Sequence, residues 1–80
     1  MRKKKLKFQD LINDYKLNYF NFSELKEKST GIIYTAFTLC EILTDDEKNE
    51  YLQRYNNIKF TNCCYRYAPE IKHTVLLIKK

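Results

Sequence analysis

The sequence predicts a small α+β protein in which three helices pack on a C-terminal antiparallel β-hairpin. Three features of the chain lead to this fold class. Residues 8–19 carry apolar side chains at helical spacing, residues 32–43 are apolar at nearly every position, and residues 58–79 form two β-rich runs around the only proline. With 80 residues, the chain is expected to form one globular domain, residues 8–80, preceded by a basic segment, residues 1–7.

The first helix is predicted from the spacing of five apolar residues. Phe8, Leu11, Ile12, Tyr15 and Tyr19 would share one helical face. The stretch that follows, NFSELKEKSTG, mixes Asn, Ser, Thr and Gly with charged residues, which is typical of a connector. Residues 21–31 are therefore expected to link the first helix to the second.

Two further helices are predicted on either side of Thr44. Residues 32–43, IIYTAFTLCEIL, are apolar nearly all round, which indicates a helix buried in the centre of the protein. Thr44 and Glu47 have the spacing of a capping box, and acidic residues fill the first turn at the positive end of the helix dipole. A third helix is therefore expected over residues 45–56.

The predicted hairpin pairs residues 58–67 with residues 71–79. Alternation along the first strand puts Ile58 and Phe60 on the face that the helices would cover. An isolated two-stranded hairpin is marginal in water, so a third strand would help to stabilise it. Its two candidate sources are residues 4–8 and a second copy of the chain, which would make a homodimer.

The adjacent cysteines raise the question of a catalytic or metal site. Cys63 and Cys64 point to opposite faces of a strand, and two registers are open: either Tyr65 or Cys64 lies opposite His73. The second register would place a thiol beside an imidazole, but the sequence supplies neither a third orienting residue nor a glycine-lined oxyanion loop. The C-x-x-C spacing of many zinc sites is absent too. We therefore expect no catalytic residue, no metal and no cofactor.

The net charge of +5 is concentrated in the first residues of the sequence. Residues 1–7 hold five of the fifteen bases and none of the ten acids, so residues 8–80 are neutral. The five bases are Arg2, Lys3, Lys4, Lys5 and Lys7. We expect a solvated extension whose removal leaves the fold intact; the alternative is a segment that contacts phosphates.

Four hairpin residues form the predicted partner-binding site. Lys59, Tyr65 and Tyr67 would lie on the sheet face that the helices leave open, and Arg66 would emerge at the sheet edge. Tyrosine tolerates both burial and water, so exposed tyrosines beside a cation suit a protein interface.

These features predict a small, non-enzymatic binding protein that acts by occupying a macromolecular partner, either a protein or a ribonucleoprotein. Size and composition suit an inhibitor of a host enzyme or defence complex, encoded by a phage or mobile element. The odd cysteine count and the lack of an apolar run of roughly 18 residues indicate a cytoplasmic protein outside the membrane. The competing hypothesis is a nucleic-acid-binding regulator that uses the basic segment.

Overall fold

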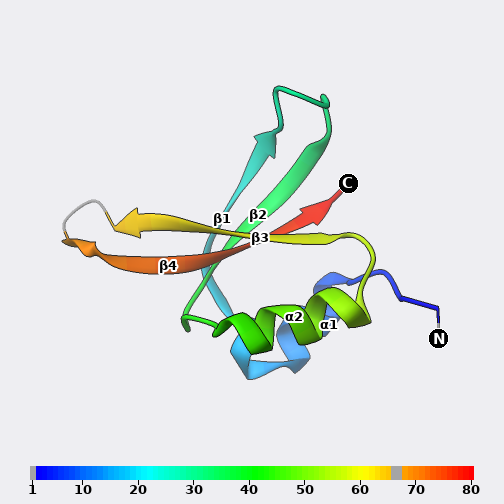
Figure 1. Cartoon of the computed structure of the whole chain (residues 1–80), viewed down its shortest axis with the longest axis horizontal. Coiled ribbons are helices and arrows are strands. Elements are labelled where there is room, and N and C mark those ends of the chain that lie inside the picture. Colours follow the sequence, from blue (N-terminus) through cyan, green and yellow to red (C-terminus); the bar gives the residue numbers. More distant parts are fainter. Residues whose placement is uncertain (1, 66–67) are drawn as a thin grey trace.

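The computed structural model describes residues 2–65 and 68–80, with side chains described for residues 2–63 and 72–80 (Figure 1). Its main feature is one antiparallel sheet of four strands in the order β1-β2-β4-β3. The strands are β1 (Tyr19–Lys26), β2 (Ile33–Leu39), β3 (Ile58–Tyr65) and β4 (Ala68–Lys79). The helical elements are α1 (Phe8–Asn13), a 3-10 turn (Tyr15–Leu17) and α2 (Asp45–Arg54), and all three pack on one face of the sheet.

The predicted arrangement of three helices on a hairpin is wrong, because the expected central helix, residues 32–43, is strand β2. This strand lies inside the sheet and is buried on both faces. Phe37 and Leu39 pack toward the helices, whereas Tyr34 and Ala36 belong to a cluster on the opposite face. A strand buried on both faces is apolar all round, like a buried helix, and its β-branched and aromatic residues favour the strand.

The expected connector, residues 21–31, is for the most part strand β1 and the turn that joins it to β2. Gly31 donates its N–H to the Glu27 carbonyl at 2.8 Å, and the Glu27 N–H donates to the Ile32 carbonyl at 2.8 Å. Gly31 has a φ of 74°, in the left-handed region that glycine adopts without strain. The STG run is thus a hairpin turn, of the kind that a glycine in a loop of three to five residues indicates.

The first helix is shorter than predicted. α1 ends at Asn13, and the carboxylate of Asp14 accepts a hydrogen bond from the Lys16 N–H at 3.0 Å, which starts the separate 3-10 turn. Leu11 and Leu17 are fully buried, but Phe8, Ile12 and Tyr15 are 52% to 65% exposed, so the apolar face predicted for residues 8–19 does not face the core as a whole. Asp14 interrupts the helix because its side chain offers the backbone an alternative hydrogen bond.

Helix α2 begins at Asp45, as predicted. The Thr44 hydroxyl accepts from the Glu47 N–H at 3.2 Å, and the Glu47 carboxylate accepts from the Thr44 N–H at 3.1 Å, which completes the capping box. Lys16 adds an ion pair to Glu47. Hydrogen bonding from Lys16 is the main cause that lowers the pKa of Glu47 below its ordinary value.

The C-terminal hairpin is present as β3 and β4, but its register is neither of those weighed above. Cys63, not Cys64 or Tyr65, lies opposite His73, and Cys64 lies opposite Lys72. The ladder is irregular between Cys64 and Tyr65, and this bulge changes the pairing near the turn.

Two apolar clusters lie on opposite faces of the sheet. The larger cluster lies between the sheet and the helices and contains Leu6, Leu11, Leu17, Phe37, Leu39, Leu43, Tyr51 and Leu76, with Ile58 and Phe60 packed against it as predicted. The smaller one contains Tyr34, Ala36, Val75 and Leu77. The β1–β2 turn curls toward the outer strand β3, so that the Glu27 carboxylate lies 3.2 Å from the Lys59 ammonium group. Ile32, at the end of this turn, packs against the smaller cluster.

Part of the N-terminal segment belongs to the packed body. The Lys4 N–H donates to the Arg54 carbonyl at 3.1 Å, and the Asn56 N–H donates to the Lys4 carbonyl at 3.0 Å. Leu6 is 4% exposed, and both its N–H and its carbonyl bond to the Asn57 side chain. Residues 4–6 thus dock beside the connection from α2 to β3 and form one parallel bridge, between Lys4 and Tyr55. They do not add a strand to the C-terminal hairpin, which was one of the two expected sources of its third strand.

Leu6→Ala is expected to lower the free energy of unfolding by about 2 to 5 kcal/mol, because the mutation leaves a cavity in the larger cluster. Leu25→Ala, at a half-exposed position, is the control and should cost less than about 1 kcal/mol. Urea titrations followed by circular dichroism would measure both changes.

Deletion of residues 1–7 should destabilise the protein too, contrary to the sequence-based expectation. In the same urea titration, a truncated chain with unchanged stability would contradict the docked position of Leu6.

Candidate binding site

The predicted partner-binding residues lie mostly outside the described part of the chain. Arg66, Tyr67 and the side chain of Tyr65 are not among the described residues. Lys59 is exposed, and its ammonium group lies 3.2 Å from the Glu27 carboxylate. An exposed pair of this kind contributes at most about 1 kcal/mol, so Lys59 remains accessible to a partner.

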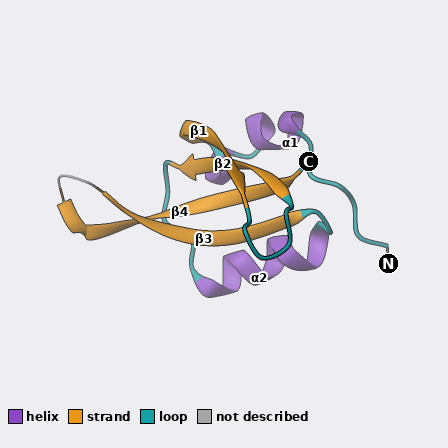
Figure 2. Ribbon diagram, turned by 90° about the horizontal axis from the view of Figure 1, so that it is seen from above, coloured by secondary structure: helices purple, strands orange, loops and turns teal. Residues whose placement is uncertain are grey.

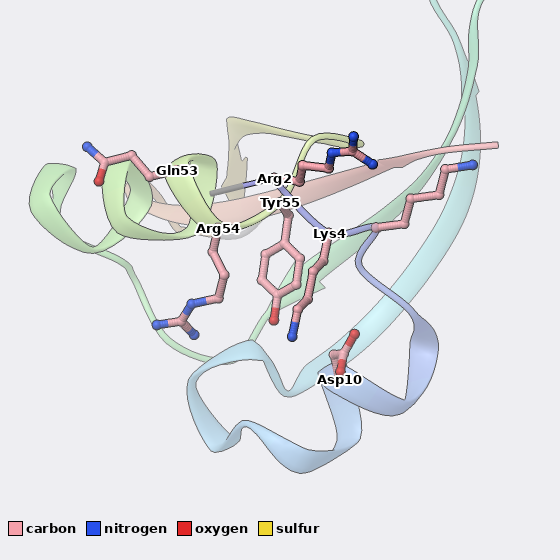
Figure 3. Close-up of a pocket in the computed structure, with 7 residues that line it drawn as sticks. Arg2, Lys4, Asp10, Gln53, Arg54 and Tyr55 are labelled. Carbon is pink, nitrogen blue, oxygen red and sulfur yellow. The ribbon is translucent and has the colours of Figure 1, made fainter.

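Three of the five predicted phosphate-contacting residues line one pocket. The pocket has a volume of about 390 Å³ and is lined by Arg2, Lys4, Lys5, Asp10, Gln53, Arg54 and Tyr55 (Figure 3). Lys3 and Lys7 are exposed and line neither this pocket nor the next one. The fold therefore brings part of the basic segment together with a base from the last turn of α2, which the sequence did not predict.

Main-chain pairing holds this pocket in shape. The bonds of Lys4 to Arg54 and Asn56 fix the segment against the end of α2. The side chains of Lys4 and Tyr55 run side by side, with Asp10 near their tips, and Arg54 extends on the other side of the Tyr55 ring (Figure 3). The Asp10 carboxylate accepts the Lys7 N–H at 2.9 Å.

A second pocket adjoins the first through Lys5. It measures about 280 Å³ and is lined by Lys5, Asn56, Asn57, Lys79 and Lys80. The Lys79 N–H donates to the Asn57 carbonyl at 2.8 Å, which ties the end of β4 to the start of β3. We call the six bases of the two pockets the basic surface: Arg2, Lys4, Lys5, Arg54, Lys79 and Lys80.

The basic surface and the acidic start of α2 lie at opposite ends of that helix. Asp45, Asp46 and Glu47 occupy the first turn, and Arg54 is the last residue. A helix of ten residues is about 15 Å long. In both views the two chain termini lie near the Arg54 end (Figures 1 and 2). The acids of the first turn of α2 and the base of its last turn are thus separated in space.

A second candidate surface consists of aromatic residues of strand β1 and of the start of α1. The rings of Phe8 and Tyr19 are 5.9 Å apart, those of Tyr19 and Phe22 are 6.0 Å apart, and Phe22 stacks on Phe37 at 6.0 Å. Phe37 is buried, but Phe8 is 52% exposed and Phe22 is 62% exposed. We call Phe8, Tyr19 and Phe22 the aromatic patch.

Strand β1 also exposes apolar side chains on its other face. Phe20, at an irregularity in the β1–β2 ladder, is half exposed and lies edge-on to the His73 ring at 5.3 Å. Leu25, opposite Tyr34, is half exposed as well. The sequence reading missed this surface because it divided residues 19–26 between a helix and a connector. The alternation of aromatic and polar residues in YFNFS was the available signal.

The cysteines and histidine do not assemble a metal site in the described part of the chain. There, no three side chains of His, Cys, Asp or Glu are close enough to hold a metal ion. Cys40 and Cys63 are exposed thiols. The register places Cys63 opposite His73, so one thiol and one imidazole are neighbours across the strands.

Comparisons of the chain with family models, with curated proteins and with solved structures found no match. Among the described residues, none of the helices has both the length and the apolar character needed to cross a membrane.

Tyr51→Phe is expected to destabilise the protein by about 1.5 to 3 kcal/mol at pH 7, because Tyr51 donates to the Asp14 carboxylate from a buried position. Burial, and next this hydrogen bond, raise the pKa of Tyr51 well above its ordinary value of 10. The stability that neutral Tyr51 contributes is therefore complete below pH 10 and is lost as the pH rises through the folded-state pKa.

Thermal melts between pH 7 and pH 11 would measure this effect. The melting temperature of the wild type should fall more steeply above pH 10 than that of Tyr51→Phe. The exposed Tyr15→Phe is the control and should follow the wild type. Parallel curves for wild type and Tyr51→Phe would contradict the bond to Asp14.

Proposed function

We propose that this chain is a non-enzymatic binding protein that takes a protein partner along the outer edge of strand β1. One observation carries the proposal: β1 is an edge strand with half-exposed or more exposed apolar side chains on both faces. Phe22 lies on the helix side of the sheet, and Phe20 and Leu25 lie on the other.

The position of the hairpin supports this use of β1. In Figure 1 the hairpin of β1 and β2 extends away from both helices, and Figure 2 shows α2 running along β3 at the opposite edge of the sheet. On its other side β1 is paired with β2, which is largely buried, so the edge strand is held in place in the sheet. An edge strand presents backbone N–H and C=O groups that can pair with another chain.

The chemistry of the edge indicates the kind of partner that it suits. An added strand would place alternate side chains on the two faces of the sheet, where it meets Phe22 on one side and Phe20 and Leu25 on the other. The expected partner segment is therefore extended and apolar on both faces. Glu24 and Lys26 lie within the same strand, and such charges disfavour unselective pairing of edges.

The role as an inhibitor from a phage or mobile element, and the cytoplasmic location, stay predictions from size and composition. The hairpin tip around Tyr65 and Tyr67 also stays a predicted contact, because it lies outside the described side chains. The proposal for β1 rests on neither of them.

Phe22→Asp is expected to reduce recovery of the partner at least about tenfold, since truncating an interface anchor typically costs about 2 kcal/mol. The matched control is Ile42→Asp, because Ile42 is also 62% exposed but lies in the connection between β2 and α2. Each immobilised protein would be incubated with an extract of the source cells, and a photo-crosslinking residue at position 22 or 42 would identify neighbours.

Crosslinking to one protein from position 22, and not from position 42, would support the proposal. Equal recovery with Phe22→Asp would contradict it. A dimer in sedimentation that Phe22→Asp converts to a monomer would also contradict it, because a second copy of the chain would then occupy the edge. Melting curves would show that both variants are folded. Phe22→Asp should lose some stability because its ring also contacts Tyr19 and Phe37, so recovery is compared per folded molecule.

A further inference from the structure

We propose that the basic surface binds the phosphodiester backbone of nucleic acid without reading the base sequence. This site is separate from the β1 edge and adds a second ligand to the proposed protein partner. It is built from three parts of the chain: the docked N-terminal segment, the last turn of α2 and the end of β4.

The shape of the surface favours an extended anion over a small one. The two pockets, of about 390 and 280 Å³, adjoin at Lys5, which lines both, and we call them together the track. The single acid among the described residues that line the track is Asp10, and its carboxylate accepts a backbone N–H. A polyanion with regularly spaced phosphates can meet bases along the whole track, which a single phosphate cannot.

Two bases of the track already pair with carboxylates, and these ion pairs compete only weakly with phosphate. Arg54 lies 3.0 Å from the Glu50 carboxylate, and Lys80 lies 3.1 Å from that of Glu24. The side chains of both pairs are between 49% and 67% exposed. Exposed pairs contribute about 0 to 1 kcal/mol, so phosphate oxygens can replace these carboxylates at little cost.

The groups that line the track suit phosphate contact and not base recognition. Lys and Arg side chains supply most of the donors, and phosphate contacts carry no sequence information. Tyr55 is half-buried against the larger apolar cluster, so its ring has little free surface for stacking on a base. Gln53, which could contact a base edge, points away from the opening (Figure 3). Binding should therefore be independent of sequence.

The acidic first turn of α2 is too far from the basic surface to prevent phosphate binding there. It would repel phosphate only if it formed the contact surface itself. Its acids lie seven to nine positions before Arg54, or about 10 to 14 Å along the helix axis, a separation larger than the screening length of about 8 Å at physiological salt.

Salt dependence tests the proposal on the full chain. The probe is a fluorescently labelled 20-nucleotide single-stranded DNA of mixed sequence, titrated by anisotropy between 50 and 300 mM salt. If all six bases meet phosphates, the slope of log K against log salt should be about −4 for the single strand and about −5 for the duplex. A second oligonucleotide of scrambled sequence should bind equally.

The paired variant Lys79→Gln with Lys80→Gln should reduce the single-strand slope by about 1.4 and weaken binding at 50 mM salt by roughly tenfold or more. The matched control, Lys48→Gln with Lys72→Gln, removes the same charge from residues that line neither pocket. It should retain most of the affinity. Circular dichroism should confirm that all variants stay folded, because the substituted side chains of the paired variant are exposed.

Four results would overturn the proposal. They are no binding at 50 mM salt, a slope near zero, an equal loss in the paired variant and its control, and a strong preference for one sequence. Binding to vesicles that contain anionic phospholipid, without binding to DNA, would assign the surface to a membrane instead. Because Lys80 pairs with Glu24 of β1, the single variant Lys79→Gln is titrated as well and should lower the single-strand slope by about 0.7. It leaves the aromatic patch and the Glu24 pair unchanged, so its result is independent of the proposed protein partner.

Discussion

The pairing of β2 with β4 is the interaction on which the rest of the structure depends. β1 with β2 and β3 with β4 are local hairpins, and a two-stranded hairpin is marginal in water on its own. The register from Tyr34 opposite Lys79 to Thr38 opposite Val75 joins them into one sheet. Because both strands are central, each buries apolar side chains on both faces, and the two apolar clusters meet at this seam. A small chain obtains a sizeable core in this way without a third layer.

The same pairing determines which surfaces face the solvent. It leaves β1 and β3 as the outer strands, and α2 lies along β3, so Phe20 and Phe22 of β1 stay more than half exposed. The pairing of β3 with β4 brings the end of β4 beside Asn57, where the N-terminal segment docks through Leu6. The exposed apolar edge and the basic surface are therefore both products of long-range pairing, although each is built from short stretches of sequence.

Local signals predicted α2 and the C-terminal hairpin, whereas β1, β2 and the docked segment depended on contacts that a sequence pattern does not show. The capping box at Thr44 needs only neighbouring residues, and α2 begins where it predicts. Residues 33–39 carry no such signal, since a largely apolar run suits both a buried helix and a central strand, and only its β-branched and aromatic content favours the strand. The turn at Gly31 was the available clue to the strand. Of the candidate site, composition predicted the bases of residues 2–5, but their meeting with Arg54 and Lys79 depends on the main-chain bonds of Lys4 and the burial of Leu6.

The docking of the N-terminal segment makes the concentration of positive charge depend on whether the chain is folded. Leu6 bonds to Asn57, which lies 51 residues further along the sequence, so the bases at positions 2–5 are scattered over a flexible coil until the chain has folded. The concentrated positive surface therefore exists only in the native state. A polyanion that prefers this surface to the unfolded chain would stabilise the protein by mass action, and the apparent melting temperature would rise with its concentration.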